Sequence, residues 1–249
     1  SQPKINVGLR VGGKTGTAEK PELRKPDRAM TVRDLFLHTS GITYAFLQQS
    51  PVDAIYRAKG IDYSRHPGDL KSFCELLATA PLVFSPGERW NYSNSTDVLG
   101  RVVEVASGMS LDEFFQKRIF APLGMKDTFF SVPEDKVSRL MACYALNATN
   151  GETVLFDPGG KASVYAKKPN VFSGGGGLAS TIGDYFTFCK MLGNGGELDG
   201  VRLLSPKTLE FMTRLKPKTI EAGLKIRGVG EKKAKEYLPD FIQIIKKHG

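Results

Sequence analysis

The stretch Phe84-Ser-Pro-Gly-Glu-Arg-Trp-Asn-Tyr-Ser-Asn94 leads from a turn through aromatic and polar residues into a helix. Its segment Ser85-Pro-Gly87 is typical of a tight turn. Beyond it, residues 95–107 place valines at helical spacing until Gly108. A loop held between a turn and a helix start presents its side chains in fixed positions. Tyr92 and Asn94 are therefore candidate site residues.

Two interpretations of Tyr92 and Asn94 follow from their chemistry. A tyrosine can act as a general base when nearby cations stabilise its phenolate. An asparagine two residues later can reach the same cleft and hold a substrate amide. The alternative is an exposed loop tyrosine followed by an asparagine that caps the helix. The Tyr-x-Asn spacing alone does not separate the two.

Outward from this stretch the sequence predicts a mostly helical body. Thr31 and Asp34 have the spacing of a capping box, and Gly41 suits a left-handed helix end. Ser110 and Glu113 have the same capping-box spacing. Hydrophobic periodicity and stop signals predict further helices over residues 69–79, 95–107, 110–119, 181–193 and 205–212. Short strands are expected at 7–11, 153–156 and 163–166, and the glycines at 174–177 exclude regular structure there.

Composition narrows the class of protein. The 249 residues are 41% hydrophobic and 24% charged, as in an ordinary globular chain. No apolar run reaches the length of a membrane span, and no signal-peptide core is present. We therefore expect no transmembrane segment and no signal peptide in this chain, and the sequence does not indicate the cellular compartment. The three cysteines and three histidines are scattered, so we expect buried, reduced cysteines and neither a metal site nor a cofactor.

Several segments together resemble the serine β-lactamase and penicillin-binding-protein family, in particular its class C β-lactamase and EstB-type esterase branch. The segments are Met30–Tyr44, Phe84–Asn94, Val98–Glu104, Ile119–Thr128, Phe172–Leu178, Asp184 and Leu192–Lys207. They follow the order and spacing of that family over about residues 21–213, which correspond to its middle portion.

The resemblance implies an α+β fold: the helical region of a β-lactamase-like serine hydrolase with a reduced or incomplete antiparallel sheet. It implies acyl transfer on a small-molecule ester, amide or β-lactam, as in β-lactamases, carboxylesterases and D-Ala-D-Ala carboxypeptidases. By position, Tyr92 matches the proton-transfer tyrosine, Asn94 the substrate-orienting asparagine and Ser93 the variable middle residue. Ser173 and Gly174 match a substrate-binding loop.

Two family motifs depart from the expected arrangement. The only Ser-x-x-Lys is Ser1-Gln-Pro-Lys4, and the residues after it do not continue a helix, so we interpret this match as coincidental. Lys14 and Thr15 lie in a segment that resembles the substrate-binding box of transpeptidases, but this box precedes the other motifs instead of following them. They are candidate substrate-binding residues, and the alternative is a glycine-rich loop without a catalytic role.

The end of the chain has a different character. Residues 214–249 carry ten Lys/Arg and four Asp/Glu, a balance of +6 within a formal net charge of +9. Gly228-Val-Gly230 and the lysines after it resemble a helix–hairpin–helix or HRDC-type segment, which binds nucleic acid through glycine amides and basic side chains. We therefore expect a β-lactamase-like domain over 1–213, without its usual N- and C-terminal parts, and a basic helical hairpin over 214–249.

Three functional hypotheses remain at this stage. The first is a serine hydrolase that acts by acyl transfer. The second is a catalytically incomplete fragment or binding module, because a convincing Ser-x-x-Lys nucleophile is missing. The third is a nucleic-acid-binding protein that uses residues 223–248, with a solvated basic hairpin as the plainer interpretation of that segment.

Overall fold

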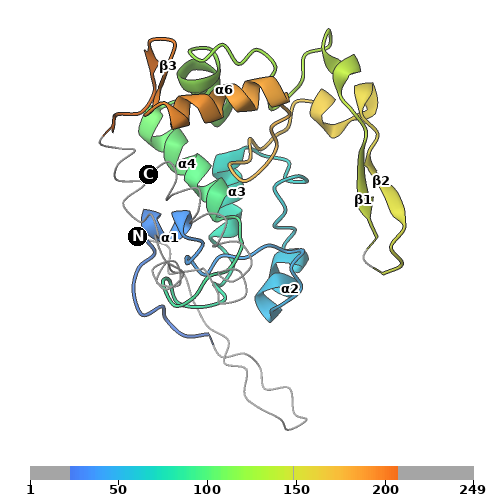
Figure 1. Cartoon of the computed structure of the whole chain (residues 1–249). Helices are drawn as coiled ribbons and strands as arrows, with labels where there is room; N and C mark the ends of the chain where they lie inside the picture. Colours follow the sequence, from blue (N-terminus) through green and yellow to red (C-terminus); the bar gives the residue numbers. More distant parts are fainter. Residues whose placement is uncertain (1–22, 148, 207–249) are drawn as a thin grey trace. The chain divides into compact units, whose positions relative to one another are not determined.

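The computed structural model describes residues 23–147 and 149–206, which are the coloured residues of Figure 1. These residues divide into two compact units. The first unit contains residues 23–59, 78–95 and 191–206, and the second contains residues 60–77 and 96–190. The predicted strand at 7–11, the candidates Lys14 and Thr15, nearly all of the predicted helix at 205–212 and the basic segment 214–249 lie outside the described residues. Among the helices described, none has the length and apolarity needed to cross a membrane.

Two short helices with the same N-terminal device lie in the first unit. Helix α1 spans Val32–Phe36, and its capping box of Thr31 and Asp34 confirms the sequence prediction. Helix α2 spans Pro51–Ala58, which the sequence analysis did not predict, although Ser50 and Asp53 form a second capping box. The sequence predicts that Gly41 ends α1 in a left-handed conformation. Gly41 has a left-handed φ of 82°, but the chain already leaves the right-handed region at His38, whose φ is 52°.

The second unit contains α3 over Leu70–Leu77 and most of α4, which spans Ser95–Ser107. Helix α5 spans Leu111–Phe115 and continues into the π-helical turn η1 at Gln116–Phe120. The predicted capping box of Ser110 and Glu113 is wrong, because the Ser110 side chain makes no capping hydrogen bond. The Leu111 N–H donates instead to Glu104 Oε1, 3.1 Å away.

The strands are few and antiparallel. β1 at Cys143–Leu146 pairs with β2 at Thr153–Asp157, which confirms the expected strand at 153–156. β3 at Glu197–Leu198 pairs with β4 at Val201–Arg202. The predicted strand at 163–166 is wrong: the 3-10 turn η4 occupies Val164–Ala166 because the Ser163 hydroxyl accepts the Tyr165 N–H. Two further 3-10 turns are η2 at Val137–Arg139 and η3 at Gly160–Ala162.

Each unit buries its own apolar side chains. In the first unit they include Leu35, Tyr44, Val52, Tyr56 and Phe84, and in the second Leu70, Phe73, Leu111, Phe130 and Val171. Helix α6 spans Ile182–Gly193, as predicted, and buries Met191. The cysteines are free, but Cys143 and Cys189 are exposed, so the expectation that all three are buried is wrong.

Candidate active site

The Tyr92-Ser-Asn94 segment is held against the residues that follow α1. The Asn91 N–H donates to the His38 carbonyl oxygen at 2.8 Å, and the Gly87 N–H donates to the Thr39 carbonyl oxygen at 2.7 Å. Beyond these two hydrogen bonds, Gly41 approaches the other segment so closely that a Cβ there would lie 2.3 Å from the Phe84 carbonyl oxygen. Backbone hydrogen bonds and close packing therefore fix the position of Tyr92 from residues about fifty positions earlier in the chain.

Asn94 lies just before the first residue of α4, and its side chain is buried. Its Nδ2 donates to the Thr43 carbonyl oxygen at 2.8 Å. Its Oδ1 is buried and has no hydrogen-bond partner among the described residues. The Asn94 side chain therefore does not cap α4, and the helix-cap interpretation of this residue is wrong.

A histidine and three buried serines form a hydrogen-bonded chain under the motif. His38 Nδ1 lies 3.2 Å from Ser93 Oγ, and Ser93 Oγ lies 2.7 Å from Ser95 Oγ. Ser95 Oγ lies 2.7 Å from Ser40 Oγ, which accepts the Ile42 N–H. Burial lowers the pKa of the His38 imidazole. Ser93, in the middle of the motif, is thus committed to the interior of the protein.

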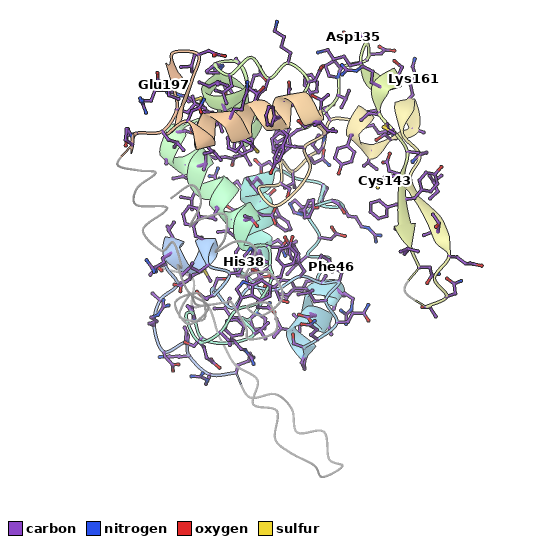
Figure 2. The ribbon with its side chains drawn as sticks, viewed as in Figure 1. His38, Phe46, Asp135, Cys143, Lys161 and Glu197 are labelled. Atoms are coloured by element: carbon purple, nitrogen blue, oxygen red, sulfur yellow. The ribbon has the colours of Figure 1, made fainter. Side chains whose placement is uncertain are left out.

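The Tyr92 ring belongs to a series of aromatic rings. Its centroid lies 5.3 Å from the His38 ring, 5.1 Å from the Tyr44 ring and 6.5 Å from the Trp90 ring. Tyr44 in turn stacks on Phe46, so His38 and Phe46, both labelled in Figure 2, belong to opposite ends of the series. The Tyr92 side chain is 44% exposed, and within residues 23–206 it makes no hydrogen bond or cation–π contact with a lysine or arginine. Its described neighbours position the ring without supplying a cation.

The glycine-rich loop of the second unit is tied to the first turns of α4. The Ser173 hydroxyl donates to Asp97 Oδ1, and the Gly175 N–H lies 3.3 Å from the same oxygen. Ser173 Oγ also accepts the Gly176 N–H at 3.0 Å. A Cβ at Gly174 would lie 2.1 Å from the Thr96 carbonyl oxygen, so only glycine fits this contact.

Asp97 is the residue of this loop anchor that the sequence analysis missed. It is fully buried, and its Oδ2 has no partner in the described chain. Burial raises the pKa of the Asp97 carboxyl against the lowering effect of the Ser173 and loop hydrogen bonds. An acidic residue in the first turn of a helix is ordinarily explained by the helix dipole. Only its hydrogen bonds with Ser173 and Gly175, which lie 76 and 78 positions later in the chain, reveal that Asp97 holds the loop.

The structure therefore brings together Tyr92 and Asn94 within the first unit, and Ser173 and Gly174 within the second. No group of three or more His, Cys, Asp or Glu side chains in the described part of the chain is arranged to hold a metal ion.

Comparison with known proteins supplies the family. Residues 19–230 match the family model described as Beta-lactamase. Monacolin J acid methylbutanoyltransferase of Aspergillus terreus is 33% identical over 199 residues, which are 78% of this chain and 44% of that relative. Esterase EstB of Burkholderia gladioli is 41% identical over 103 residues, which are 41% of this chain and 26% of EstB. The chain spans less than half the length of these curated relatives.

A solved structure agrees with the sequence comparisons. Unliganded simvastatin synthase (LovD) from Aspergillus terreus is similar to this chain with a TM-score of 0.63 and 30% identity, over 90% of this chain and 52% of that one. The resemblance inferred from the sequence motifs, including that to EstB, is confirmed. On the match over residues 19–230, the chain belongs to the β-lactamase family.

Proposed function

We propose that the protein performs acyl transfer on small-molecule esters, as a hydrolase or as an acyltransferase. One relative is named as a methylbutanoyltransferase and another as an esterase, and both activities transfer an acyl group. Amides and β-lactams are alternative substrates with the same carbonyl chemistry. Because the chain spans less than half of these relatives, the proposal concerns the class of reaction.

The observation that carries the proposal is the unpaired Oδ1 of Asn94, two residues from the half-exposed Tyr92. A buried acceptor without a donor costs about 1–3 kcal/mol. Native structures keep few such groups, and functional sites are one place where they occur. In the proposal, Asn94 Oδ1 accepts a hydrogen bond from a cation beside the reacting ester. The Tyr92 hydroxyl transfers a proton between the nucleophile and the leaving group.

The loop residues receive a modified role in the proposal. The Ser173 hydroxyl is engaged with Asp97, so its proposed part in substrate binding is to shape the glycine-rich loop, and Gly174 allows that loop to lie on the α4 backbone. Lys14 and Thr15 remain proposed substrate-binding residues. Ser93 is not proposed as the nucleophile because it is buried and bonded to His38 and Ser95.

Covalent labelling tests the proposal and identifies the nucleophile. The chain is incubated with a fluorophosphonate and, separately, with a fluorescent penicillin, and any adduct is located by peptide mass spectrometry. We expect a stoichiometric phosphonate adduct on one serine. In Tyr92→Phe we expect labelling to slow by about 100-fold or more, because a positioned acid–base group contributes roughly 10²–10⁴-fold.

The matched control is Tyr144→Phe, which removes the same hydroxyl from an exposed tyrosine of the β1–β2 hairpin and should label at the rate of the parent chain. A folded sample that forms no adduct would contradict the proposal and favour a non-catalytic binding module. Equal labelling rates in the two tyrosine variants would remove Tyr92 from the mechanism.

A further inference from the structure

We propose that a cavity next to Tyr92 binds a small-molecule carboxylate with an apolar body, and that Arg89 recognises the carboxylate. The assignment of this molecule as part of the substrate rests on the proposed acyl transfer, whereas its binding does not.

The cavity lies within the first unit and has a volume of about 330 Å³. This is at the lower end of the range for sites that hold small molecules. Its walls come from the start of α2 and from the turn before the Tyr92 motif, and they include Gln49, Val52, Phe84, Arg89, Trp90 and Asn91. Phe84 and Trp90 give it aromatic surface, which suits an apolar ligand body.

The charges lining the cavity favour an anion. Asp53 also lines it, but this carboxylate is buried and accepts hydrogen bonds from Thr43 Oγ1, the Gln49 and Ser50 N–H groups and Ser50 Oγ. Both of its oxygens are therefore already occupied by protein donors. Arg89 is exposed, and within residues 23–206 its guanidinium makes no ion pair. A ligand carboxylate is the complementary group, because guanidinium binds it through two parallel hydrogen bonds.

The Arg89 guanidinium is also positioned. It lies over the Phe84 ring with 4.8 Å between Cζ and the ring centroid. A cation–π contact of this kind orients the guanidinium while leaving its N–H groups available. Among the other polar groups of the wall, the Asn91 amide is already engaged with the Ile42 carbonyl oxygen. The Gln49 carboxamide is exposed and has no hydrogen-bond partner among the described residues, so it can assist Arg89.

Trp90 is shared by the cavity wall and the aromatic surroundings of Tyr92. This residue lines the cavity, and its ring stacks on the Tyr92 ring at a centroid distance of 6.5 Å. A molecule in the cavity therefore lies against a residue whose ring packs on that of the proposed proton-transfer residue. We infer that the cavity holds the part of the ester substrate that carries a free carboxylate.

Trp90 also supplies the measurement, because it is the only tryptophan in the sequence. The chain is titrated with 4-phenylbutyrate and with the neutral 4-phenylbutyramide while tryptophan fluorescence is followed. We expect the acid to change the Trp90 emission and to bind about 10-fold or more tightly than the amide. Arg89→Gln should weaken binding of the acid by about 10-fold or more and leave binding of the amide unchanged.

The control Arg33→Gln removes the same charge from an exposed position on α1 outside the cavity and should leave binding of the acid unchanged. Circular dichroism of both variants establishes that they are folded. Equal affinities for acid and amide, or equal losses in the two arginine variants, would overturn the proposal.

A second measurement separates this inference from the proposed function. Hydrolysis is followed with the p-nitrophenyl monoester of adipic acid and with the p-nitrophenyl ester of hexanoic acid. We expect Arg89→Gln to lower kcat/KM about 10-fold for the adipate ester only. Selective binding of 4-phenylbutyrate without hydrolysis of either ester would support the cavity and count against acyl transfer. Hydrolysis of the esters without selective binding of 4-phenylbutyrate would support acyl transfer and overturn the proposed carboxylate site.

Discussion

At the residue scale, His38 has an unusual backbone conformation within the candidate site. Its φ of 52° is in the left-handed region, where a non-glycine residue is held only by its surroundings. Those surroundings are the Asn91 N–H on its carbonyl oxygen, the Ser93 hydroxyl on Nδ1 and the Trp90 and Tyr92 rings. The conformation of His38 and the position of the Tyr92 motif therefore depend on each other.

His38 predicts a loss of stability at acidic pH. Burial lowers the pKa of its imidazole in the folded protein, whereas the unfolded chain has the ordinary value of about 6.5. Below about pH 6.5 the unfolded state therefore binds more protons at this ring, so the free energy of unfolding falls as pH falls. Urea unfolding near pH 7.5 and pH 5.5 measures this loss, and His38→Gln should reduce it.

The control is His66→Gln, which removes the histidine that contacts Ser72 in the second unit. We expect it to keep the pH dependence of the parent chain. If His38→Gln and the parent chain lose the same stability between the two pH values, the half-buried His38 imidazole is not responsible.

At the element scale, the anchoring of the glycine-rich loop to α4 explains why glycine occupies position 174. We predict that Gly174→Ala destabilises the protein by about 1–3 kcal/mol, because the new Cβ would collide with the Thr96 carbonyl oxygen. The free energy of unfolding in urea measures the effect. Gly183→Ala is the control, since a Cβ at this position of α6 would meet only Thr181 Oγ1 at 3.9 Å.

In an exposed helix, alanine is more favourable than glycine by up to about 1 kcal/mol, so Gly183→Ala should be neutral or stabilising. A Gly174→Ala protein as stable as Gly183→Ala would show that the loop can move away from α4 at no cost.

The elements also show what the sequence could predict. Signals within a few residues succeeded, as for Thr31 with Asp34, and the equivalent Ser50 with Asp53 was available but was not used. Ser110 with Glu113 failed: the Ser110 side chain caps no N–H, and at the same helix start the Leu111 N–H donates to Glu104 of the preceding helix. A partner brought in by the fold therefore replaced the local cap.

The candidate site followed the same rule. The motif identified Tyr92 and Asn94 because their identity and spacing are local. The hydrogen bonds that define their surroundings, from His38 to Ser93 and from Asn94 to Thr43, join residues 55 and 51 positions apart. A single sequence contains no signal for such pairs. The orphan Oδ1 of Asn94 and the cavity around Arg89 therefore became visible only in the structure.

At the scale of the whole molecule, the described chain leaves large apolar side chains in water. The β1–β2 hairpin exposes Leu146 by 74% and Phe156 by 76%, and α6 exposes Ile182 by 91%. A two-stranded hairpin buries little surface of its own. Apolar surface on this scale is a feature of contact regions, and it binds apolar dyes.

We predict that the native chain binds the dye ANS and that Leu146→Lys combined with Phe156→Lys reduces the fluorescence. The reason is that both changes replace exposed apolar surface with charge and remove no buried contact. Thr149→Lys, at the exposed turn of the same hairpin, adds a lysine without removing apolar surface and is the control. An unchanged dye signal in the double variant would place the binding surface elsewhere.

The chain of hydroxyl groups beneath Tyr92 links the half-buried His38 ring to the interior of the protein. Hydrogen bonds join Ser40 to Ser95, Ser95 to Ser93 and Ser93 to His38 Nδ1, and Ser40 Oγ also accepts the Ile42 N–H. A hydroxyl group can donate one hydrogen bond and accept others, and a ring nitrogen donates when protonated and accepts when not. A change of protonation at His38 can therefore be answered by rotation of the serine hydroxyl groups, without movement of the backbone that holds Tyr92.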